Sequence, residues 1–600
     1  MLCQDRGSEQ LWRHDRFGRA SLRIGSDPDV AVYHWAPLTS GSRWFVFWPF
    51  LLPFTVINVA GWMHPPGRRA SVARALAGLV ALGSTAFLTG WSVIASQVLL
   101  RGDGTWKAWL GWFLALVALV AVVLLAVRSQ HGFEEVEPPA QIARLPKSSG
   151  LRDPSFFARA RRRRLTLALH VVAILGTFIY IAWRAESSSV ASAADTVVTV
   201  IGAVEVGLLV LLALATVHRG KAWSLSAFTA AAAGVALISG FMSAWLMTAV
   251  GVCPHGAPAT TADCSRLSGG AFALVDVYGW ALLVTLGVAA MVVVGTLSAP
   301  APGEHAAKRA DLLPGLMATM RARVAVIPSR IIVAATTGAV VFVALSAVLF
   351  PLREPATVHR WCDSMPVIED SDWPCTALPD DSGEPWRLTS SAPVTVARWT
   401  FFGLLTFLVI NLLKSRGDFV KLRRISSIWD VVTFWPRAFH PFAVRPYAER
   451  AVPELQHLLV DGVDDWRGQE MHVWAHSQGS VLVVAAVAPL AGEDGAAQLM
   501  ATSLLTFGSP IRTLYQRAFP AYFDDSLVRS VHDVRLWEWR NVFKFTDHIG
   551  RAVFVDDADW EGSNGDRGLS DPGPDGGPIR GHSGYWDDAR LPGVEANDEQ

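Results

Sequence analysis

The chain has 600 residues, of which 51% are hydrophobic and 17% charged, and its 52 Lys and Arg balance its 52 Asp and Glu. Together with a positive mean hydropathy, this composition excludes a single water-soluble domain, because such domains carry about 25% charged residues. We therefore expect a membrane part in addition to any water-soluble part.

The first 42 residues form an N-terminal tail that is rich in arginine. In this tail we expect at most one strand, around Val30 to Trp35. Nine long apolar runs follow it, at about 43–63, 75–100, 107–127, 165–184, 196–217, 226–250, 271–297, 330–350 and 393–413. A helix needs about 20 apolar residues to cross a bilayer. The sequence therefore predicts an α-helical polytopic membrane domain over residues 43–416.

The first apolar run leaves two crossing counts open. Pro49 and Pro53 interrupt it, and proline removes an amide donor and kinks a helix. A straight first helix gives nine crossings and places the N-terminus outside. A first segment that enters the membrane and returns gives eight crossings, with both termini inside.

Basic residues in the loops set the expected orientation. Lys and Arg are concentrated in loops 64–74, 128–164, 218–225 and 298–330, so these loops are predicted to lie inside. The run Arg161 to Arg164 beside a membrane helix indicates contact with anionic lipid headgroups rather than with nucleic acid. The last crossing then places residues 417–600 in the cytoplasm, at the cell membrane.

The five cysteines are consistent with this orientation. Two of them fall together in each of two loops predicted to lie outside, and the remaining one is Cys3. Disulfides are rare in the cytosol and permitted on an exported face, so we expect two disulfide candidates, Cys253–Cys264 and Cys362–Cys375. Zinc is the competing interpretation, but the spacing is not C-x-x-C and no histidine cluster accompanies it.

Four ionisable residues lie in or near the apolar runs: His170, Glu205, Asp276 and Arg398. Such groups are costly in a bilayer and are often functional. We favour contacts between helices for them, or, for Arg398, a side chain that extends to the membrane surface. Glu205 is the first candidate if the membrane part transports or senses a ligand.

The segment Met471 to Leu490 carries the strongest chemical signal in the chain. A short apolar run ends in Ala475-His476-Ser477-Gln478-Gly479, and a long apolar segment of small residues follows. Strand, G-x-S-x-G-like corner and helix in this order predict a nucleophile elbow, in which Ser477 sits on a strained turn before a helix N-terminus. Ala475 replaces the first glycine of the motif and is the mildest replacement.

An acid and a base follow in workable order. After the loop Thr506-Phe507-Gly508-Ser509-Pro510, an apolar strand ends near Asp547, and a Gly- and Asp-rich loop leads to Gly581-His582-Ser583-Gly584-Tyr585-Trp586. The order Ser477, Asp547, His582 is that of α/β hydrolases. His582 would take the Ser477 proton, while Asp547 would fix the imidazole tautomer.

Together these motifs resemble the C-terminal half of lipase-type α/β hydrolases, and more narrowly bacterial hydrolase-like proteins fused to a helical membrane region. The resemblance covers about residues 425–590, with a weaker similarity at 32–41. It implies a C-terminal α/β-hydrolase-like domain at 417–600, to which the tail 1–42 would contribute. It also implies an oxyanion hole built from the Gln478 amide and a second donor. The usual His-Gly loop is missing, so the second donor would come from elsewhere, such as Phe434 to Arg437.

The expected function is that of a membrane-bound serine hydrolase of the lipase or esterase type. It would act through an acyl-enzyme on Ser477, without cofactor or metal. Tethering beside the bilayer raises the effective concentration of membrane-resident substrates, so membrane lipids or lipid-like esters are the expected substrates. The alternative is a membrane transport or signalling protein whose hydrolase-like domain is not catalytic.

Overall fold

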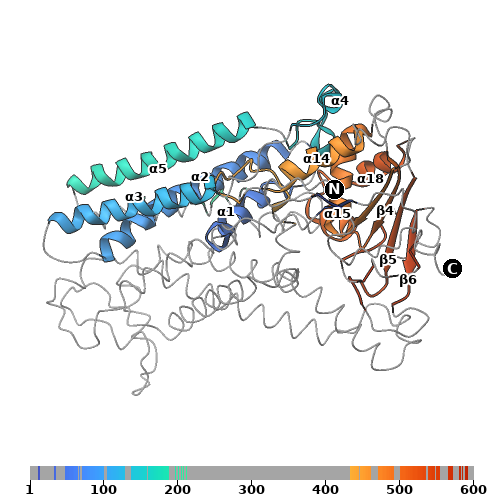
Figure 1. The fold of residues 1–600 in the computed structure, drawn as a ribbon. Coiled ribbons are helices and arrows are strands. Elements are labelled where there is room, and N and C mark those ends of the chain that lie inside the picture. Colours follow the sequence, from blue (N-terminus) through green and yellow to red (C-terminus); the bar gives the residue numbers. More distant parts are fainter. Residues whose placement is uncertain are drawn as a thin grey trace, which may run out of the picture.

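The structure is a computed structural model (Figure 1). It describes residues 11–13, 33–35, 48–99, 105–128, 137–187, scattered positions in 196–211, 431–460, 471–491, 501–534, 538–554, 565–571 and 580–591, with gaps of one or two residues inside several ranges. Four predicted apolar runs, most of the run 196–217, all five cysteines, Asp276 and Arg398 lie outside the described residues.

Three long helices extend side by side away from the C-terminal part of the chain (Figure 1). They are α2 (Ala70–Leu99), α3 (Thr105–Arg128) and α5 (Ala160–Ser187), and α2 packs against both of the others. Within the part of the chain that the structure describes, two stretches are long and apolar enough to cross a membrane, Ala70–Val93 and Leu165–Arg184. All three helices coincide with predicted apolar runs, and their crossing of a bilayer stays a prediction.

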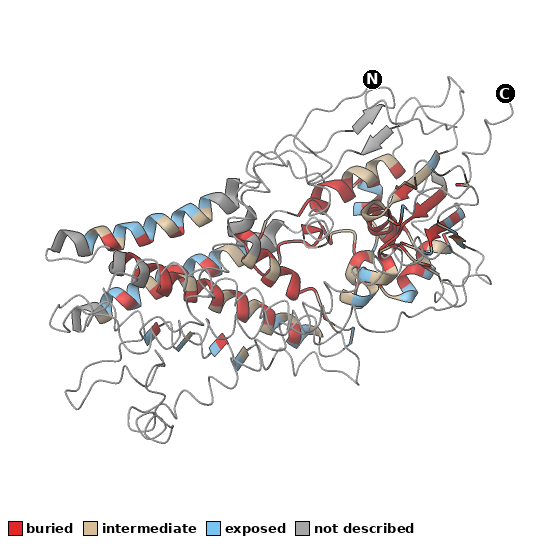
Figure 2. Cartoon of the chain, turned by 90° about the horizontal axis from the view of Figure 1, so that it is seen from below, coloured by how far each residue is buried: buried red, intermediate tan, exposed pale blue. Residues whose placement is uncertain are grey.

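Exposed residues follow one another along α5 (Figure 2), and many of them are apolar. Leu165, Val172, Ile179 and Trp183 are each at least 63% exposed. Their spacing places them along one side of the helix. An exposed apolar stripe of this length is typical of a surface that lipid or another protein covers. A helix buried in the core of a soluble protein does not present such a stripe.

The first apolar run forms a short helix, α1 (Trp48–Ala60), with Pro53 inside it. Thirteen residues at 1.5 Å each span about 20 Å, whereas the hydrocarbon core of a bilayer is about 30 Å thick. The helix ends at a turn that packs against the C-terminal part, because Trp62 stacks on Trp435 at 5.6 Å between ring centroids. This geometry favours a segment that returns to its starting side.

The N-terminal tail contains two strands, so the prediction of at most one strand is wrong. Two three-residue strands, β1 (Leu11–Arg13) and β2 (Tyr33–Trp35), pair antiparallel with Leu11 opposite Trp35. Three residues are too few for an alternating pattern to appear in the sequence. The strand at Leu11–Arg13 exists through its long-range partner, which local sequence does not reveal.

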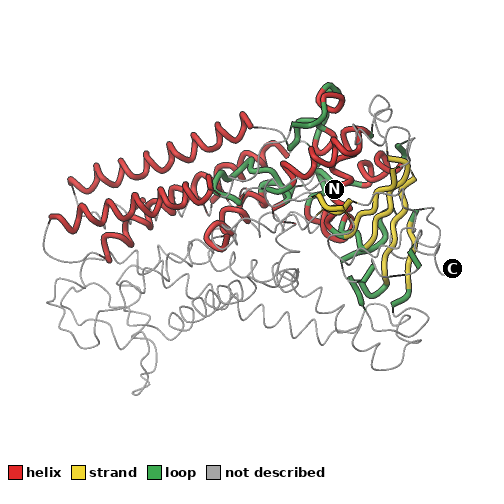
Figure 3. Tube along the Cα trace, in the orientation of Figure 1, coloured by secondary structure: helices red, strands yellow, loops and turns green. Residues whose placement is uncertain are grey.

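The C-terminal part contains a four-stranded parallel sheet in the order β3-β4-β5-β6 (Figure 3). Its strands are β3 (Met471–His476), β4 (Ala501–Phe507), β5 (Glu538–Lys544) and β6 (Asp566–Leu569). The connections contain α15 (Gln478–Val487), η7 (Ala488–Leu490), η8 (Ile511–Tyr515), α17 (Gln516–Ala518) and α18 (Asp525–His532). Since all four strands are parallel, their carboxyl ends meet at one edge, which is where sites form in such sheets.

The segment between α3 and α5 packs on the C-terminal part. It contains α4 (Ala140–Ala143) and η3 (Gly150–Arg152). The Arg152 guanidinium donates to Ser526 Oγ at 3.1 Å and to Ser530 Oγ at 3.3 Å, both on α18. This segment belongs to the loop 128–164, which the charge rule places on the same side as residues 417–600. The contact is consistent with that placement.

A second junction joins residues 434–444 to α1, the first of the apolar helices (α1, α2, α3 and α5), which we call the membrane-type helices. Asn58 of α1 donates to the Pro436 carbonyl at 3.2 Å and accepts from the Phe439 and His440 amides at 3.1 and 3.3 Å. Thr55 accepts from the Val444 amide at 3.0 Å. A non-helical backbone between such helices requires protein partners for its polar groups, and these two side chains supply them.

Of the four ionisable residues singled out in the apolar runs, the two that the structure describes, His170 and Glu205, are both buried. The His170 ring lies 4.9 Å from the His440 ring, and its Nδ1 donates to the Thr166 carbonyl at 2.9 Å. His440 lies in the loop 434–444 and Thr166 on the same helix α5, so these two contacts differ from the expected contact between helices. Glu205 lies against Gly83, and neither of its carboxylate oxygens has a hydrogen-bond partner within the described structure.

Core packing unites these parts. The main hydrophobic core contains residues of α1 and α2, of 142–157, of α14 (Ala448–Val460), of α15 and of α18. Its largest members are aromatic side chains with little or no exposure, among them Trp435, Tyr515 and Phe519. The sheet, its helices and the near ends of the membrane-type helices therefore form one packed unit.

The short α1 and its contact with the C-terminal part predict that both chain termini lie on one side of the membrane. A reporter fused at the N-terminus and one fused at the C-terminus are expected to report the same compartment. A fusion at Gly102, between α2 and α3, is the control and is expected to report the opposite one. Opposite compartments for the two termini would establish nine crossings and separate residues 1–42 from residues 417–600.

Candidate active site

The corner between β3 and α15 holds Ser477 in a strained backbone conformation. Its φ is 53° and its ψ is −120°, and among the described residues it is the one non-glycine residue with a positive φ. The Ser477 amide donates to the Phe507 carbonyl of β4 at 3.0 Å, and the Ser480 amide donates to the Ser477 carbonyl at 3.0 Å. Such strain persists only where surrounding bonds impose it, and it is characteristic of sites with a function.

Ala475 fits the corner in place of the usual glycine. It is buried at the end of β3, and a β-carbon built on Gly479 would lie 3.8 Å from the Ala475 methyl group. This is an ordinary van der Waals distance. The Ala475 methyl group therefore leaves ordinary space at the turn, even on the side that faces Gly479.

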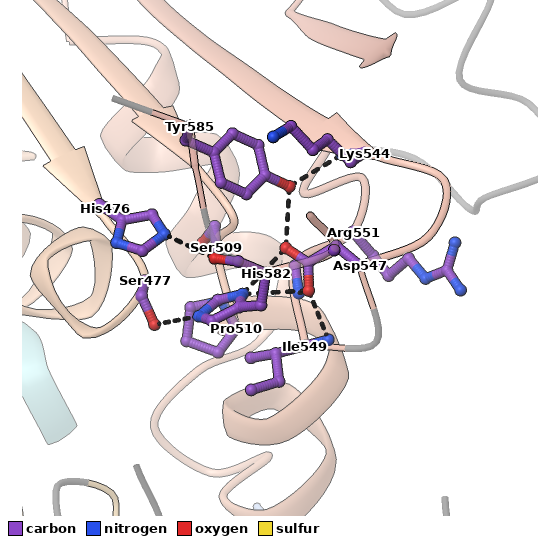
Figure 4. Close-up of polar contacts among 12 residues, drawn as sticks. His476, Ser477, Ser509, Pro510, Lys544, Asp547, Ile549, Arg551, His582 and Tyr585 are labelled. Carbon is purple, nitrogen blue, oxygen red and sulfur yellow. Dashed lines mark hydrogen bonds and ion pairs between the residues drawn. The ribbon is translucent and has the colours of Figure 1, made fainter. Parts of the chain in front are cut away.

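His582 connects the serine to the carboxylate (Figure 4). Its Nε2 lies 2.8 Å from Ser477 Oγ, and its Nδ1 lies 3.0 and 2.9 Å from the two oxygens of Asp547. An ionised carboxylate only accepts hydrogen bonds, so Nδ1 carries the proton and Nε2 accepts from the serine. The imidazole thus holds the tautomer that a general base requires.

The loop that carries His582 is fixed by the carboxylate of Asp571. The Gly581 amide donates to Asp571 at 2.7 Å and the Arg580 amide at 3.1 Å, and Thr546 Oγ1 donates to the same carboxylate. Gly581 has a φ of 55°, a left-handed conformation that glycine adopts without strain. Asp571 therefore ties the histidine loop to the turn that follows β5.

Asp547 is fully buried and accepts hydrogen bonds from every side. Beyond His582, its oxygens accept from the Ile549 amide at 2.8 Å, the Gly550 amide at 2.9 Å and the Tyr585 hydroxyl at 2.8 Å. Burial alone would raise the pKa of this carboxyl group. The hydrogen bond and charge of His582, together with the Gly550 and Ile549 amides, outweigh burial and hold the pKa of Asp547 below its usual range.

Two glycines make room behind the acid. Gly508, in the loop Thr506 to Pro510, has a φ of 59°, and a β-carbon there would lie 3.0 Å from the Tyr585 ring and 3.3 Å from Asp547 Oδ2. A β-carbon on Gly550 would overlap Gly508 Cα and lie 2.6 Å from Asp547 Oδ2. These backbones therefore approach as closely as only glycine permits.

Gln478, whose amide is the expected oxyanion donor, directly follows Ser477 at the corner, and its role as that donor stays a prediction. Its amide is the first of α15, and the first amides of a helix have no acceptor within that helix. Its side chain is fixed, because Nε2 donates to the Tyr447 hydroxyl at 2.5 Å and to the Tyr515 hydroxyl at 2.7 Å. The amide thus belongs to a rigid corner.

The loop Phe434 to Arg437, the predicted second donor, lies one aromatic ring away from Gln478. Phe434 packs on Tyr515 with 5.5 Å between ring centroids. The Pro436 carbonyl is held by Trp62 Nε1 at 2.9 Å as well as by Asn58. That the loop Phe434 to Arg437 supplies the second donor of an oxyanion hole stays a prediction.

The other described histidines that neighbour Ser477 or follow it in the chain do not contact the Ser477 hydroxyl in the way that His582 does. The His476 ring stacks on the His582 ring at 5.1 Å between centroids, and its Nε2 donates to the His582 carbonyl at 3.3 Å. His532 and His548 also follow Ser477 in the chain and would be the next candidates for the base if His582 were not the base. His532 pairs with Asp533 at 3.0 Å and packs on Phe554. His548 lies outside the described residues.

Several residues of the site carried no sequence signal of their role. Tyr585 stands inside the segment Gly581 to Trp586, Gly550 follows Asp547 by three positions, and Lys544 ends an apolar strand, yet nothing local identifies their roles. Their contacts with Asp547 and with each other arise from tertiary packing. The unexpected lysine in an apolar strand was the one signal available, since a buried lysine needs partners.

Within the described ranges, no group of three or more His, Cys, Asp or Glu side chains is arranged to hold a metal ion. We compared the chain with protein-family models, with curated proteins and with solved structures, and none of these comparisons gave a match. The interpretation of the site therefore depends on its own geometry.

Gly550→Ala is expected to lower ester turnover by roughly 100-fold or more, because displacing a catalytic group by about 1 Å has an effect of that order. The new methyl group must push Asp547 or Gly508 away. Gly78→Ala is the matched control, since nothing lies within 4 Å of a β-carbon at Gly78 on α2. Turnover and thermal stability are measured for both variants. Normal turnover in Gly550→Ala would contradict the close packing described around the acid.

Proposed function

We propose that the chain is a membrane-bound serine hydrolase that cleaves carboxylic esters. The observation that carries the proposal is the continuous hydrogen-bonded path from Ser477 through His582 to the buried Asp547. The strained φ of Ser477 at the strand-to-helix corner adds to it. A serine in ordinary packing needs neither a histidine base nor a left-handed backbone.

The proposed reaction proceeds in two halves. Ser477 Oγ attacks the ester carbonyl while His582 Nε2 takes the serine proton. The developing oxyanion accepts a hydrogen bond from the Gln478 amide. His582 then returns the proton to the departing alcohol, which leaves an acyl-enzyme. A water molecule gives its proton to His582, attacks the acyl carbon and releases the acid, and Ser477 regains its proton.

The order of the site along the sheet supports an α/β-hydrolase-like domain. The nucleophile follows β3, the acid follows β5 and the base follows β6, all at the carboxyl edge of parallel strands. This is the chain order Ser, Asp, His of that class. The described sheet is small, and the proposal extends to the wider domain at 417–600, with the tail 1–42 as a further part.

The membrane part supports a lipid-like ester as substrate. Two helices are apolar and long enough to cross a bilayer, and the exposed stripe of α5 suits contact with lipid tails. A catalytic domain packed on the ends of such helices meets membrane-resident esters at a high effective concentration. The basic loops support a cytoplasmic position for the site at the cell membrane.

A second candidate function has one observation in its favour. Glu205 is buried among the membrane-type helices without a described hydrogen-bond partner, and such a group is often part of an ion or substrate path. A transporter or sensor with an idle hydrolase-like domain would have no ester turnover. The variants below separate the two.

Ser477→Ala, His582→Ala and Asp547→Asn are each expected to lower ester turnover by about 10⁴- to 10⁶-fold, and double variants to lose little more, because the three residues act as a unit. The measurement is hydrolysis of a series of lipid-like and water-soluble esters by the full chain in membranes. His532→Ala, which removes a histidine that pairs with Asp533, is the control and is expected to retain turnover. Near-normal turnover in His582→Ala would show that the base is misassigned.

A further inference from the structure

Lys544, the last residue of β5, is a buried cation three positions before Asp547 in the chain. Its side chain is 1% exposed, and Nζ donates to the Gly584 carbonyl at 3.1 Å. Nζ also lies 3.6 Å from Asp588 Oδ2 and 4.6 Å from the centre of the Tyr585 ring. Burial lowers the pKa of Lys544, and the charges of Asp588 and Asp571 oppose that effect. The lysine thus fastens the segment that follows His582 onto β5.

Tyr585 has a single possible hydrogen-bonding arrangement at its hydroxyl. The Lys544 amide donates to Oη at 2.8 Å, and Oη lies 2.8 Å from Asp547 Oδ2. An amide is a donor and an ionised carboxylate is an acceptor, so the phenol proton points to Asp547. Burial, and then the charge of Asp547, raises the pKa of Tyr585 far above its usual value. The hydroxyl therefore keeps this proton and donates it constantly.

Two aromatic rings and the Lys544 ammonium group pack around the tyrosine ring. It is fully buried, and its ring centroid lies 5.5 Å from that of His476 and 5.7 Å from that of Phe507. Gly508 leaves space for its edge. Because the ring is unable to swing away, the hydroxyl maintains its direction toward the acid (Figure 4).

We propose that Tyr585 is a positioning residue that sets how strongly Asp547 holds the His582 proton, with Lys544 fixing Tyr585 in turn. The inference rests on the proposed function. It adds two members to the path, which then runs from the Lys544 amide through Tyr585 and Asp547 to His582 and Ser477.

The shared oxygen of Asp547 explains the effect. Oδ2 accepts from Tyr585 and from His582 Nδ1, so the phenol draws negative charge that would otherwise stabilise protonated His582. Removing the phenol hydroxyl makes His582 hold its proton to higher pH, and a stronger phenol donor makes it release the proton at lower pH. The titratable groups that face Tyr585 or Lys544 from the packed elements are His476, Asp547, Asp571, Arg580, His582 and Asp588.

The test is the pH dependence of kcat/KM for ester hydrolysis by the full chain, because its acid limb reports the essential base. In Tyr585→Phe the midpoint of this limb is expected to rise by roughly 0.5 to 1 pH unit, and the maximum to fall about tenfold. With 3-fluorotyrosine at position 585, whose phenol is more acidic and nearly the same size, the midpoint is expected to fall. Tyr522→Phe is the matched control: it removes a buried hydroxyl that bonds His64 at 3.0 Å, away from Asp547, and leaves the midpoint unchanged.

Opposite shifts in the two Tyr585 variants support the proposal, since a purely structural role has no reason to reverse sign. An unchanged midpoint in both, or shifts in the same direction, would overturn it. If Tyr585→Phe does not fold, the near-isosteric fluorinated variant decides alone, by a lower midpoint or an unchanged one. Absence of ester turnover in the unmodified chain would instead overturn the proposed function, so the two failures are distinguishable.

Discussion

The arrangement of the site depends on one buried charge, the carboxylate of Asp547. A carboxylate without exposure to water is strongly unfavourable unless hydrogen bonds satisfy it. Four donors do so: the Ile549 and Gly550 amides, the Tyr585 hydroxyl and the His582 imidazole. The first two fix the turn after β5, and the last two bring the C-terminal segment to the sheet. The same bonds that make the buried charge tolerable therefore align the histidine with Ser477.

The Ser477 corner and the near ends of α1 and α2 are parts of one packed unit. The Gln478 side chain binds Tyr515, Tyr515 packs on Phe434, and the neighbouring Trp435 stacks on Trp62 at the end of α1. Polar bonds accompany the rings, because Asn58 satisfies the backbone of 436–440. In an interior packed this densely, the position of one element constrains the next. The helices thus support the corner mechanically, and in the proposed function they also hold it near a bilayer.

Local motifs were sufficient to predict which residues meet at the site, because strand, corner and helix around Ser477 have a fixed chemistry and the acid and base follow in a known order. The supporting residues were beyond reach of the sequence. Lys544 and Tyr585 are 41 positions apart, and the need for glycine at position 550 depends in part on the distant Gly508, which packs against it. The β1 strand and the insertion of 434–444 beside α1 likewise arise from long-range pairing. Composition predicted α2, α3 and α5 because apolar helices are a local property.

The central claim is that Ser477 is an activated nucleophile, and covalent labelling tests it most directly. The full chain in membranes is treated with a fluorophosphonate, and the adduct is located by peptide mass spectrometry. The account predicts one adduct per chain, on Ser477, with labelling abolished in Ser477→Ala and strongly slowed in His582→Ala. Ser509→Ala, which removes a buried hydroxyl 2.8 Å from Ser480 Oγ, should still be labelled. No adduct on Ser477, or equal labelling rates with and without His582, would contradict the account.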